Sequence, residues 1–352
     1  MRKLYRPLLA VAGAALFTGL LGGCGSSEEV SSTVPSASPS TTITTQTQAP
    51  QKDLNPLTGQ RDLEKGASTR PVAVMIGNNS KSRPQPGLDQ ADLYVEMETE
   101  GGITRIMAVF ANSTRLPDKL GPVRSARTPF ALLAQSLDAI YCHAGGSSAG
   151  LSTIDKQNIP HLNALAYEGT AFWRDPTLRQ QKGLEYSMMT NADKLTALIH
   201  KSDFRSSSNR AAPFSFGEKS GNGAGQAVQV VFSGNQSIHF RYDAASCQYD
   251  KYNGRIGTSS PHQSAEGRTL SVSNVVILYD DKYAENNTTI SFRLKSGSGQ
   301  LITGGTSRDI RWSRSSNGLV LTETDGSSLL VSPGKTYICV VTKGNQDQTI
   351  CQ

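Results

Sequence analysis

Two runs of alternating apolar and polar residues, joined by a pair of glycines, most strongly constrain how this chain folds. The runs occupy residues 92–100 (DLYVEMETE) and 103–111 (ITRIMAVFA), with Gly101 and Gly102 between them. Side chains alternate between the two faces of a strand, and paired glycines supply the positive φ angles of a tight hairpin turn. We therefore predict an antiparallel hairpin with one apolar face. Its register places Leu93 opposite Phe110, Val95 opposite Ala108, Met97 opposite Ile106, and Glu98 opposite Arg105 as an ion pair.

The rest of the chain divides into a mixed first half and a strand-rich second half. Short apolar runs at residues 71–76 and 139–144 predict buried strands, and residues 127–137 and 191–202 have the apolar spacing of helices. Beyond residue 225, apolar runs recur at strand spacing. These patterns predict an α/β (α+β) fold, with an α/β N-terminal region and a mostly antiparallel β C-terminal region. The breaker-rich residues 206–225 are predicted to separate domains at residues 53–205 and 226–352.

The first 52 residues are predicted to carry a targeting signal and a tether. A basic start, an apolar run over residues 8–21 and the sequence Leu21-Gly22-Gly23-Cys24 are typical of a lipoprotein signal peptide at residues 1–23. Cys24 is then the lipidated, palmitate-bearing residue, and an uncleaved membrane anchor is the alternative. Residues 24–52 are rich in Ser, Thr, Pro and Gln, which predicts a disordered tether. The expected location is the extracytoplasmic face of the cell membrane, in a Gram-positive envelope.

Charge and location limit the partners that this chain is expected to have. The formal net charge is +6, and three of the positive charges lie within residues 1–23. The remaining excess weakly favours an anionic partner, such as a cell-wall polymer or an envelope protein. The extracytoplasmic location and the lack of a basic and aromatic recognition motif argue against nucleic acid.

Four cysteines besides Cys24 leave the disulfide pattern open. They are Cys142, Cys247, Cys339 and Cys351, and an oxidising exterior permits three ways of pairing them. Cys339 and Cys351 flank a stretch that predicts a hairpin. Directly opposed strand positions accept a disulfide, which favours a Cys339–Cys351 bond. Free buried thiols are the alternative.

The stretch GPVRSART, residues 121–128, carries the most specific chemical hypothesis. Arg124 and Arg127 directly precede the predicted helix that begins at Pro129. Helix N-termini attract anions, and guanidinium groups hold carboxylates or phosphates through two parallel hydrogen bonds. With Arg105 alongside, the pair is a candidate site for a ligand anion. The alternative is that these arginines lock loops to the protein's own carboxylates.

A short serine motif offers the competing, catalytic hypothesis. Residues 146–150 fit G-x-S-x-G, and a predicted strand precedes them, as in the nucleophile elbow of hydrolases. Ser148 would then be the nucleophile, with a later histidine such as His200 or His262 as the base. The alternative is a glycine turn that admits a ligand or packs closely against a neighbour.

Other titratable groups give weaker signals. The trio Glu96, Glu98 and Glu100 is consistent with acid–base chemistry or with a hard cation, but a solvated strand face or arginine partners are the favoured explanation. The histidines are His143, His161, His200, His239 and His262, and their scatter predicts no metal site and no cofactor. His143 ends a predicted buried strand beside the glycine turn, where either a proton donor or a hydrogen-bonded core residue is expected.

Several longer motifs together resemble the YerB-like lipoprotein family. They are RPVAVMIGN, RPQPGLDQAD, EGGITR, GPVRSAR and HAGGS in the first half, and SNVVIL and PGKTYI in the second. The resemblance implies a layered ββα sandwich with an α/β N-terminal and a β-rich C-terminal region, and it implies no assigned activity. The motif residues that supply the candidate ligand site are Glu100, Gly101, Gly102, Arg105, Arg124, Ser125, Arg127, His143, Gly145 and Gly146.

Two departures from the family pattern bear on function. Relatives commonly have proline near the position of Ser148, which weakens the case for a nucleophile there. Relatives often have a His-Asn pair near Glu185-Tyr186-Ser187, so this protein has altered that position. The sequence thus predicts a non-catalytic, lipid-anchored protein that binds an anionic envelope ligand or partner. A wall-processing hydrolase or transferase using Ser148 or His143 is the alternative, and a scaffold with fully paired arginines is a third.

Overall fold

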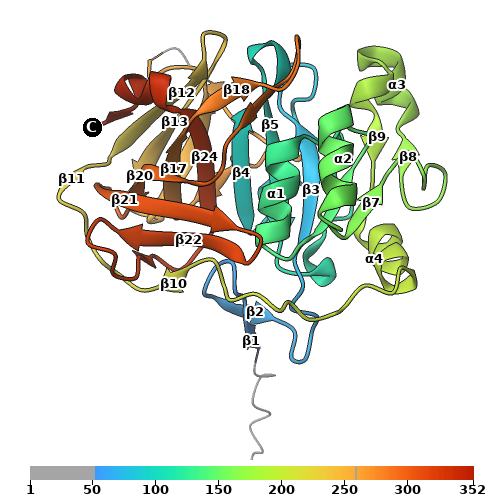
Figure 1. Ribbon diagram of the computed structural model, residues 1–352, viewed down its shortest axis with the longest axis horizontal. Coiled ribbons are helices and arrows are strands. Elements are labelled where there is room, and N and C mark those ends of the chain that lie inside the picture. The colour runs from blue at the N-terminus through green and yellow to red at the C-terminus, as the bar shows by residue number, and fades with distance from the viewer. Residues whose placement is uncertain (1–51, 258–259) are drawn as a thin grey trace, which may run out of the picture. The chain divides into compact units, whose positions relative to one another are not determined.

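The computed structural model describes residues 52–257 and 260–352 (Figure 1). The predicted signal peptide, the lipidation residue Cys24 and the tether up to residue 51 lie outside the described residues. All described residues belong to one compact unit.

Strands from both halves of the sequence share one eleven-stranded mixed sheet. In spatial order its strands are β11 (Gly223–Ala224), β21 (Thr306–Ser315), β20 (Ser296–Thr303), β17 (Asn274–Asp280), β24 (Thr336–Thr342), β4 (Leu93–Glu98), β5 (Thr104–Phe110), β3 (Val72–Gly77), β6 (Ile140–His143) and β7 (His161–Asn163), with β22 (Gly318–Glu323) paired to β21. The junction between the halves is the parallel pair of β24 with β4. The two halves of the chain are therefore joined by a continuous ladder of backbone hydrogen bonds.

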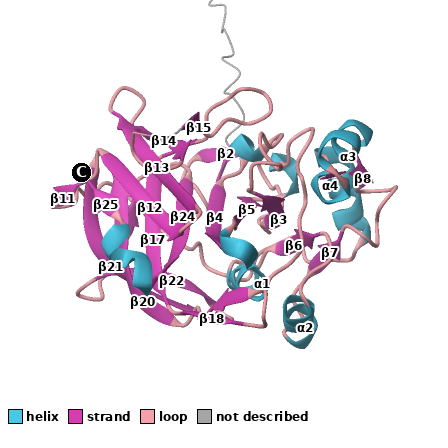
Figure 2. Cartoon of the chain, turned by 90° about the horizontal axis from the view of Figure 1, so that it is seen from above, coloured by secondary structure: helices cyan, strands magenta, loops and turns pink. Residues whose placement is uncertain are grey.

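A second, six-stranded sheet covers one face of the first. It contains β15 (Ser260–Pro261), β14 (Gln248–Asn253), β13 (Gln236–Asp243), β12 (Ala227–Ser233) and β25 (Ile350–Cys351), with β16 (Ser271–Val272) paired to β14. Between the sheets, Tyr94, Phe240 and Tyr337 belong to one buried cluster, and the Tyr94 and Tyr337 rings stack at 5.3 Å. On the opposite face, Phe130 of helix α1 (Thr128–Ser136) packs with Val95 in a second cluster. This arrangement confirms the predicted α+β fold in ββα layers (Figure 2).

Three further helices and several short strand pairs complete the fold. The helices are α2 (Ser148–Lys156), α3 (Pro176–Lys182) and α4 (Ala192–Lys201), and the pairs are β1 (Asp53–Leu54) with β2 (Arg61–Leu63), β8 (Trp173–Arg174) with β9 (Met188–Met189), β10 (Ser215–Phe216) with β23 (Leu330–Val331), and β18 (Lys282–Ala284) with β19 (Ile290–Phe292). Asn191 caps α4 by accepting from the Lys194 amide at 3.0 Å. Side-chain caps of this kind satisfy backbone donors that the first turn leaves unpaired.

The predicted hairpin of β4 and β5 is present, but its predicted register is wrong by one residue. Leu93 lies opposite Val109, and Arg105 lies opposite Met97 rather than Glu98. A slip of one residue moves every side chain of a strand to the other face of the sheet. Arg105 therefore shares the face that carries α1, and the expected Glu98–Arg105 ion pair does not form. Glu98 instead accepts from Lys282 Nζ at 2.9 Å.

The predicted hairpin between Cys339 and Cys351 is also wrong. Residues after β24 form a 3-10 helix, Lys343–Gln348, and β25 pairs with β12 of the second sheet. Cys339 lies between β17 and β4 in the middle of the large sheet. The two cysteines are thus not opposed, and all four cysteines among the described residues are free thiols.

A buried polar network links the two halves where their sheets face each other. The fully buried carboxylate of Glu96 accepts from Asn78 Nδ2 at 2.7 Å, Thr104 Oγ1 at 2.6 Å and the Tyr337 hydroxyl at 2.5 Å. Lys251 Nζ lies 3.7 Å from the same carboxylate. Glu96 therefore has the hydrogen bonds and the opposite charge that a buried carboxylate requires, so the expectation of a solvated acidic face is wrong here.

The network continues from Lys251 through a buried histidine. His262 Nδ1 lies 2.8 Å from Lys251 Nζ, and His262 Nε2 lies 3.0 Å from Gln85 Oε1. Burial lowers the pKa of His262 well below its ordinary value, and the ammonium of Lys251 adds to this shift. The neutral ring accepts from Lys251 and donates to Gln85, which fixes its tautomer.

Candidate functional site

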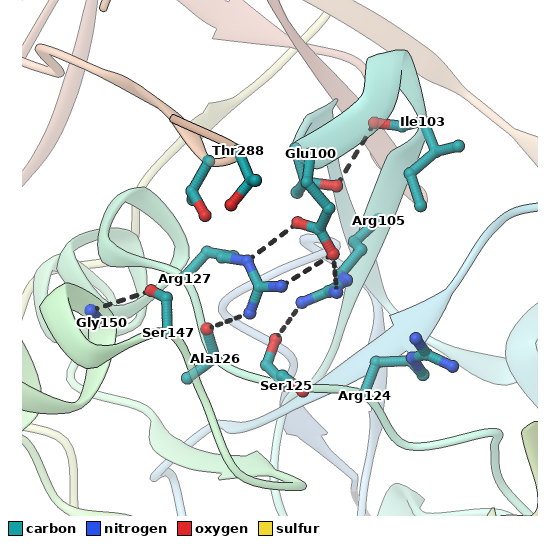
Figure 3. Close-up of polar contacts among 12 residues, drawn as sticks. Glu100, Ile103, Arg105, Arg124, Ser125, Ala126, Arg127, Ser147, Gly150 and Thr288 are labelled. Carbon is teal, nitrogen blue, oxygen red and sulfur yellow. Dashed lines mark hydrogen bonds and ion pairs between the residues drawn. The ribbon is translucent and has the colours of Figure 1, made fainter. Parts of the chain in front are cut away.

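The loop between β5 and α1 brings the predicted arginines to one place beside the sheet. The hydrogen bonds that hold its backbone include those from the Arg124 amide to the Met75 carbonyl and from the Ala126 amide to the Gly145 carbonyl, each 2.9 Å long. Arg127 occupies the N-cap position of α1. Because Arg105 of β5 lies on the same face of the sheet, the three guanidinium groups lie close together (Figure 3).

Glu100 is the carboxylate that joins two of these arginines. Arg127 Nε donates to Glu100 Oε2 at 2.9 Å, and Arg127 Nη2 donates to Oε1 at 2.7 Å. Arg105 Nη2 donates to the same Oε1, and Arg105 Nη1 donates to the Ser125 carbonyl at 2.6 Å (Figure 3). Glu100 lies in the turn of the β4–β5 hairpin, where Gly101 and Gly102 have φ angles of 64° and 72°. The glycine turn thus positions the carboxylate for both arginines.

The charges at this cluster do not cancel. Burial lowers the pKa of Arg105 to about 9, and the neighbouring Arg127 contributes to the shift. Burial alone would raise the pKa of Glu100, but Arg105 and Arg127 outweigh burial and hold that pKa below its ordinary value. Two guanidinium groups thus share one carboxylate, and a net positive charge remains.

Arg124 has a different and more exposed partner. Its guanidinium donates to the Glu185 carbonyl at 2.7 Å and to Glu185 Oε2 at 3.0 Å, and it lies 4.8 Å above the ring of Tyr186. The side chain of Glu185 is 71% exposed. Exposed ion pairs contribute little to stability because water competes for both groups.

These arginines line an open cavity of about 300 Å³. The lining comprises Glu100, Arg105, Val123, Arg124, Ser125, Arg127, Ala144, Leu165, Arg174, Leu184 and Glu185. Four arginines thus face two glutamates, and Arg174 has its own partner in Glu168 at 3.3 Å. Leu165 and Leu184 are 50% and 52% exposed. A cationic cavity with apolar groups beside it suits an anion attached to an apolar body.

The other predicted site residues shape the cavity from behind. The Gly145 carbonyl accepts from His143 Nδ1 at 2.8 Å, and the Gly145 amide donates to Asn163 Oδ1 at 2.9 Å. Gly146 packs against Leu151 and Ala126, where a side chain would collide. His143 is fully buried and does not line the cavity. Its expected place in the cleft is therefore wrong, because its ring turns away toward His161.

Ser148 lacks the partners that a catalytic serine needs. It is the exposed first residue of α2, directly after Ser147, whose Oγ caps the helix by accepting from the Gly150 amide at 3.1 Å. Both ring nitrogens of His143 are bonded to other groups. No hydrogen bond found among residues 52–257 and 260–352 joins Ser148 to a histidine. A general base must be within hydrogen-bond reach of its nucleophile, so the serine hypothesis has no geometric support in the described part of the chain.

Two groups near the site gave no signal in the sequence. Glu285, in the turn between β18 and β19, accepts from Thr128 Oγ1 at 2.5 Å and lies 3.5 Å from Ser147 Oγ. It thereby places a negative charge at the N-termini of both α1 and α2, where helix dipoles favour it. Arg174 joins the cavity from β8. Neither residue is close in sequence to the arginine motif, and only the tertiary fold brings them there. Within the described ranges, no group of three or more His, Cys, Asp or Glu side chains could hold a metal ion.

Comparisons with known proteins agree with this architecture. The family described as "Protein of unknown function (DUF3048) N-terminal domain" matches residues 57–205, and the corresponding C-terminal domain family matches residues 228–338. The arginine cluster lies wholly within the first match, whereas Glu285 lies in the second.

A curated relative and a solved structure extend the likeness to most of the chain. The relative, "Putative lipoprotein YerB" of Bacillus subtilis (strain 168), is 28% identical over 295 residues, which cover 81% of this chain and 85% of the relative. The crystal structure of YerB from Bacillus subtilis has a TM-score of 0.73 at 26% identity and covers 85% of this chain and 99% of that one. None of the helices in the described part of this chain is long and apolar enough to cross a membrane. The chain belongs to the YerB-like lipoprotein family.

Proposed function

We propose that this protein is anchored by a lipid at the extracytoplasmic face of the cell membrane, where its arginine cavity binds an anionic ligand without catalysis. The ligand is an acidic group of a cell-wall polymer or of an envelope protein. One observation carries the proposal: four arginines and two glutamates line an open cavity beside the N-terminus of α1. Oriented guanidinium groups favour a bound anion.

The internal ion pairs leave room for such a ligand. Arg105 and Arg127 are fixed on Glu100 and form a rigid, net positive wall. Arg124 is held only by the exposed Glu185. A ligand carboxylate or phosphate can replace Glu185 on Arg124 and also meet the neighbouring cationic wall. A fully paired scaffold would instead have balanced charges and no open cavity.

The anchor is supported by the sequence and by the name of the relative. The charged and apolar start of the chain and the Leu21-Gly22-Gly23-Cys24 stretch fit a lipoprotein signal. The curated relative is named as a lipoprotein. A lipid on Cys24 would place the cavity within reach of the cell wall through the Ser- and Thr-rich segment that follows.

Replacement of two arginines should weaken retention on cell-wall material. A chain beginning at residue 25, which retains the whole compact unit, is incubated with purified wall fragments, and bound protein is measured. Arg124→Ala/Arg127→Ala should weaken binding by at least about tenfold, because each charge-assisted hydrogen bond contributes about 1.5–3 kcal/mol. Arg268→Ala is the matched control, since it removes an exposed, paired arginine from another surface. Equal retention of the wild type and the double variant, both shown to be folded by circular dichroism, would overturn the proposal.

Removal of the competing carboxylate should have the opposite effect. Glu185→Gln keeps the size of the side chain but frees Arg124 from its charged partner. Affinity for the anionic wall fraction should rise up to about fivefold, the range expected when an exposed ion pair of about 0.2–1 kcal/mol is lost. The same titration in high salt should remove the difference because salt screens exposed charges. A decrease in affinity would show that Glu185 itself contacts the ligand, contrary to the proposal.

A further inference from the structure

A second and larger cavity lies at the edge of the large sheet, between β7 and α4. Its volume is about 720 Å³. The lining comprises His161, Leu162, Ala166, Tyr167, Thr170, Ala171, Lys194, Ala197, Leu198, Lys201, Ser202 and Phe204. None of these residues lines the arginine cavity. A volume of this size matches the pockets of about 300–1,000 Å³ that hold small molecules.

The hydrogen bonds behind this cavity determine which ring nitrogen of His161 is an acceptor. The Gly145 carbonyl can only accept, so His143 Nδ1, 2.8 Å away, carries a proton. Burial lowers the pKa of His143 to about 4, so the ring is neutral and its Nε2 is an acceptor. His161 Nδ1, 3.0 Å from that Nε2, must therefore donate to it. In the neutral His161 ring the remaining nitrogen, Nε2, is then an acceptor on the side away from His143.

The remaining wall combines apolar surface with positive charge. Leu162, Leu198 and Phe204 supply an apolar wall that is at least half buried, and Leu162 is completely so. Lys194 and Lys201, about two turns apart on α4, supply two ammonium groups at the rim. Every lining residue lies in the described part of the chain, and none of them is acidic. The cavity thus complements a molecule with an apolar body and a negative head.

We infer that this cavity binds a small amphipathic anion whose head group also donates a hydrogen bond, such as a singly protonated alkyl phosphate. The alkyl chain packs on Leu162, Leu198 and Phe204. The charged oxygens lie near the ammonium groups of Lys194 and Lys201, and the P–OH group donates to His161 Nε2. A carboxylate satisfies the lysines but has no proton for the histidine at neutral pH, and an alcohol satisfies the histidine but not the lysines.

Calorimetric titration with octyl phosphate, octanoate and octanol at pH 6, below their aggregation limits, tests this inference. At that pH a phosphate monoester is about half singly protonated, since its second pKa is about 6. The wild type should bind octyl phosphate at least about tenfold more tightly than octanol, a difference of about 1.4 kcal/mol. Octanoate should bind with intermediate affinity. Equal affinity for the three compounds, or no binding of octyl phosphate, would overturn the inference.

Four variants assign any binding to this cavity. Ala197→Trp fills the cavity from an exposed helix position and should abolish binding. Lys156→Gln, on α2, is the matched control for the loss of a lysine charge, and it should bind like the wild type. Lys194→Gln/Lys201→Gln should reduce the affinity for both anions to that for octanol. His161→Phe should remove only the preference for octyl phosphate over octanoate. Wild-type affinity of Ala197→Trp, with an unchanged melting temperature, would place the ligand elsewhere and refute the assignment.

The arginine variant keeps this test separate from that of the proposed function. Arg124→Ala/Arg127→Ala alters only the arginine cavity, so it should bind octyl phosphate like the wild type. Loss of octyl phosphate binding in that variant would show that the alkyl phosphate occupies the arginine cavity and would overturn the inference. This titration is independent of the wall-fragment assay, so the inference and the proposed function can fail separately.

Discussion

Lys251→Met is expected to destabilise the protein by about 3–5 kcal/mol, the range for breaking a buried ion pair by removing one partner. The reason is that Glu96 would remain fully buried next to a methyl group instead of an ammonium. The His262 ring would also lose the group that donates to its Nδ1. The measurement is the free energy of unfolding in urea at pH 7, for a chain beginning at residue 25.

The double variant Glu96→Gln/Lys251→Met separates loss of the charge pair from loss of packing. Without a buried carboxylate, the double variant should be more stable than Lys251→Met alone. Lys343→Met is the matched control, because that lysine and its partner Asp281 are 46% and 61% exposed, and it should leave the stability almost unchanged. A loss of less than about 1 kcal/mol in Lys251→Met as well would mean that Glu96 does not need its cation.

Acidification is expected to destabilise the protein strongly between pH 6.5 and pH 4, before most carboxylates titrate. Burial lowers the pKa of His143 from 6.5 to about 4. Burial also lowers the pKa of His161, and burial with Lys251 lowers that of His262 well below 6.5. The unfolded chain takes up protons near pH 6.5 while the folded chain does not, so stability is complete above pH 6.5 and declines as the pH falls. His143 alone should account for about 3 kcal/mol at pH 4, at about 1.36 kcal/mol per pKa unit.

Urea unfolding at a series of pH values measures this dependence. His143→Gln should lower stability at pH 7, because it disturbs the bonds to Gly145 and His161, and it should also flatten the decline below pH 6.5. His200→Gln is the control, since His200 is an exposed residue of α4, and its pH profile should match that of the wild type. An identical slope in His143→Gln would contradict the assignment.

Local patterns in the sequence were enough to predict the elements of the fold, because each depends on neighbouring residues. The alternation around Gly101 predicted the β4–β5 hairpin, and the apolar spacing of residues 191–202 predicted α4. Such local patterns do not indicate which other segments of the chain pack against a strand. The polar face of β4 looked solvated, but the second sheet covers it and turns Glu96 into part of a buried network. The second sheet, which covers this face of β4, comes from residues more than a hundred positions away in the sequence.

The candidate site shows the same division between local and distant information. Arg124 and Arg127 could be selected from the sequence because they directly precede a helix. The one-residue error in register was decisive for Arg105, since the true register places it with Arg127 and Glu100 instead of Glu98. Cys339 and Cys351 were separated for a related reason, because β25 pairs with a strand of another sheet. Strand pairing over long distances cannot be derived from alternation alone.

The central position of β24 has a consequence for how this protein is made. β24 is the last long strand in the chain, yet it lies between β17 and β4 and pairs with both in parallel. Synthesis from the N-terminus therefore delivers β4 and β17 before the strand that joins them. Until residue 342 has emerged, each of these strands presents an open edge, and such edges invite pairing with other chains. Premature termination anywhere before β24 would accordingly leave a fragment prone to aggregate rather than a smaller functional domain.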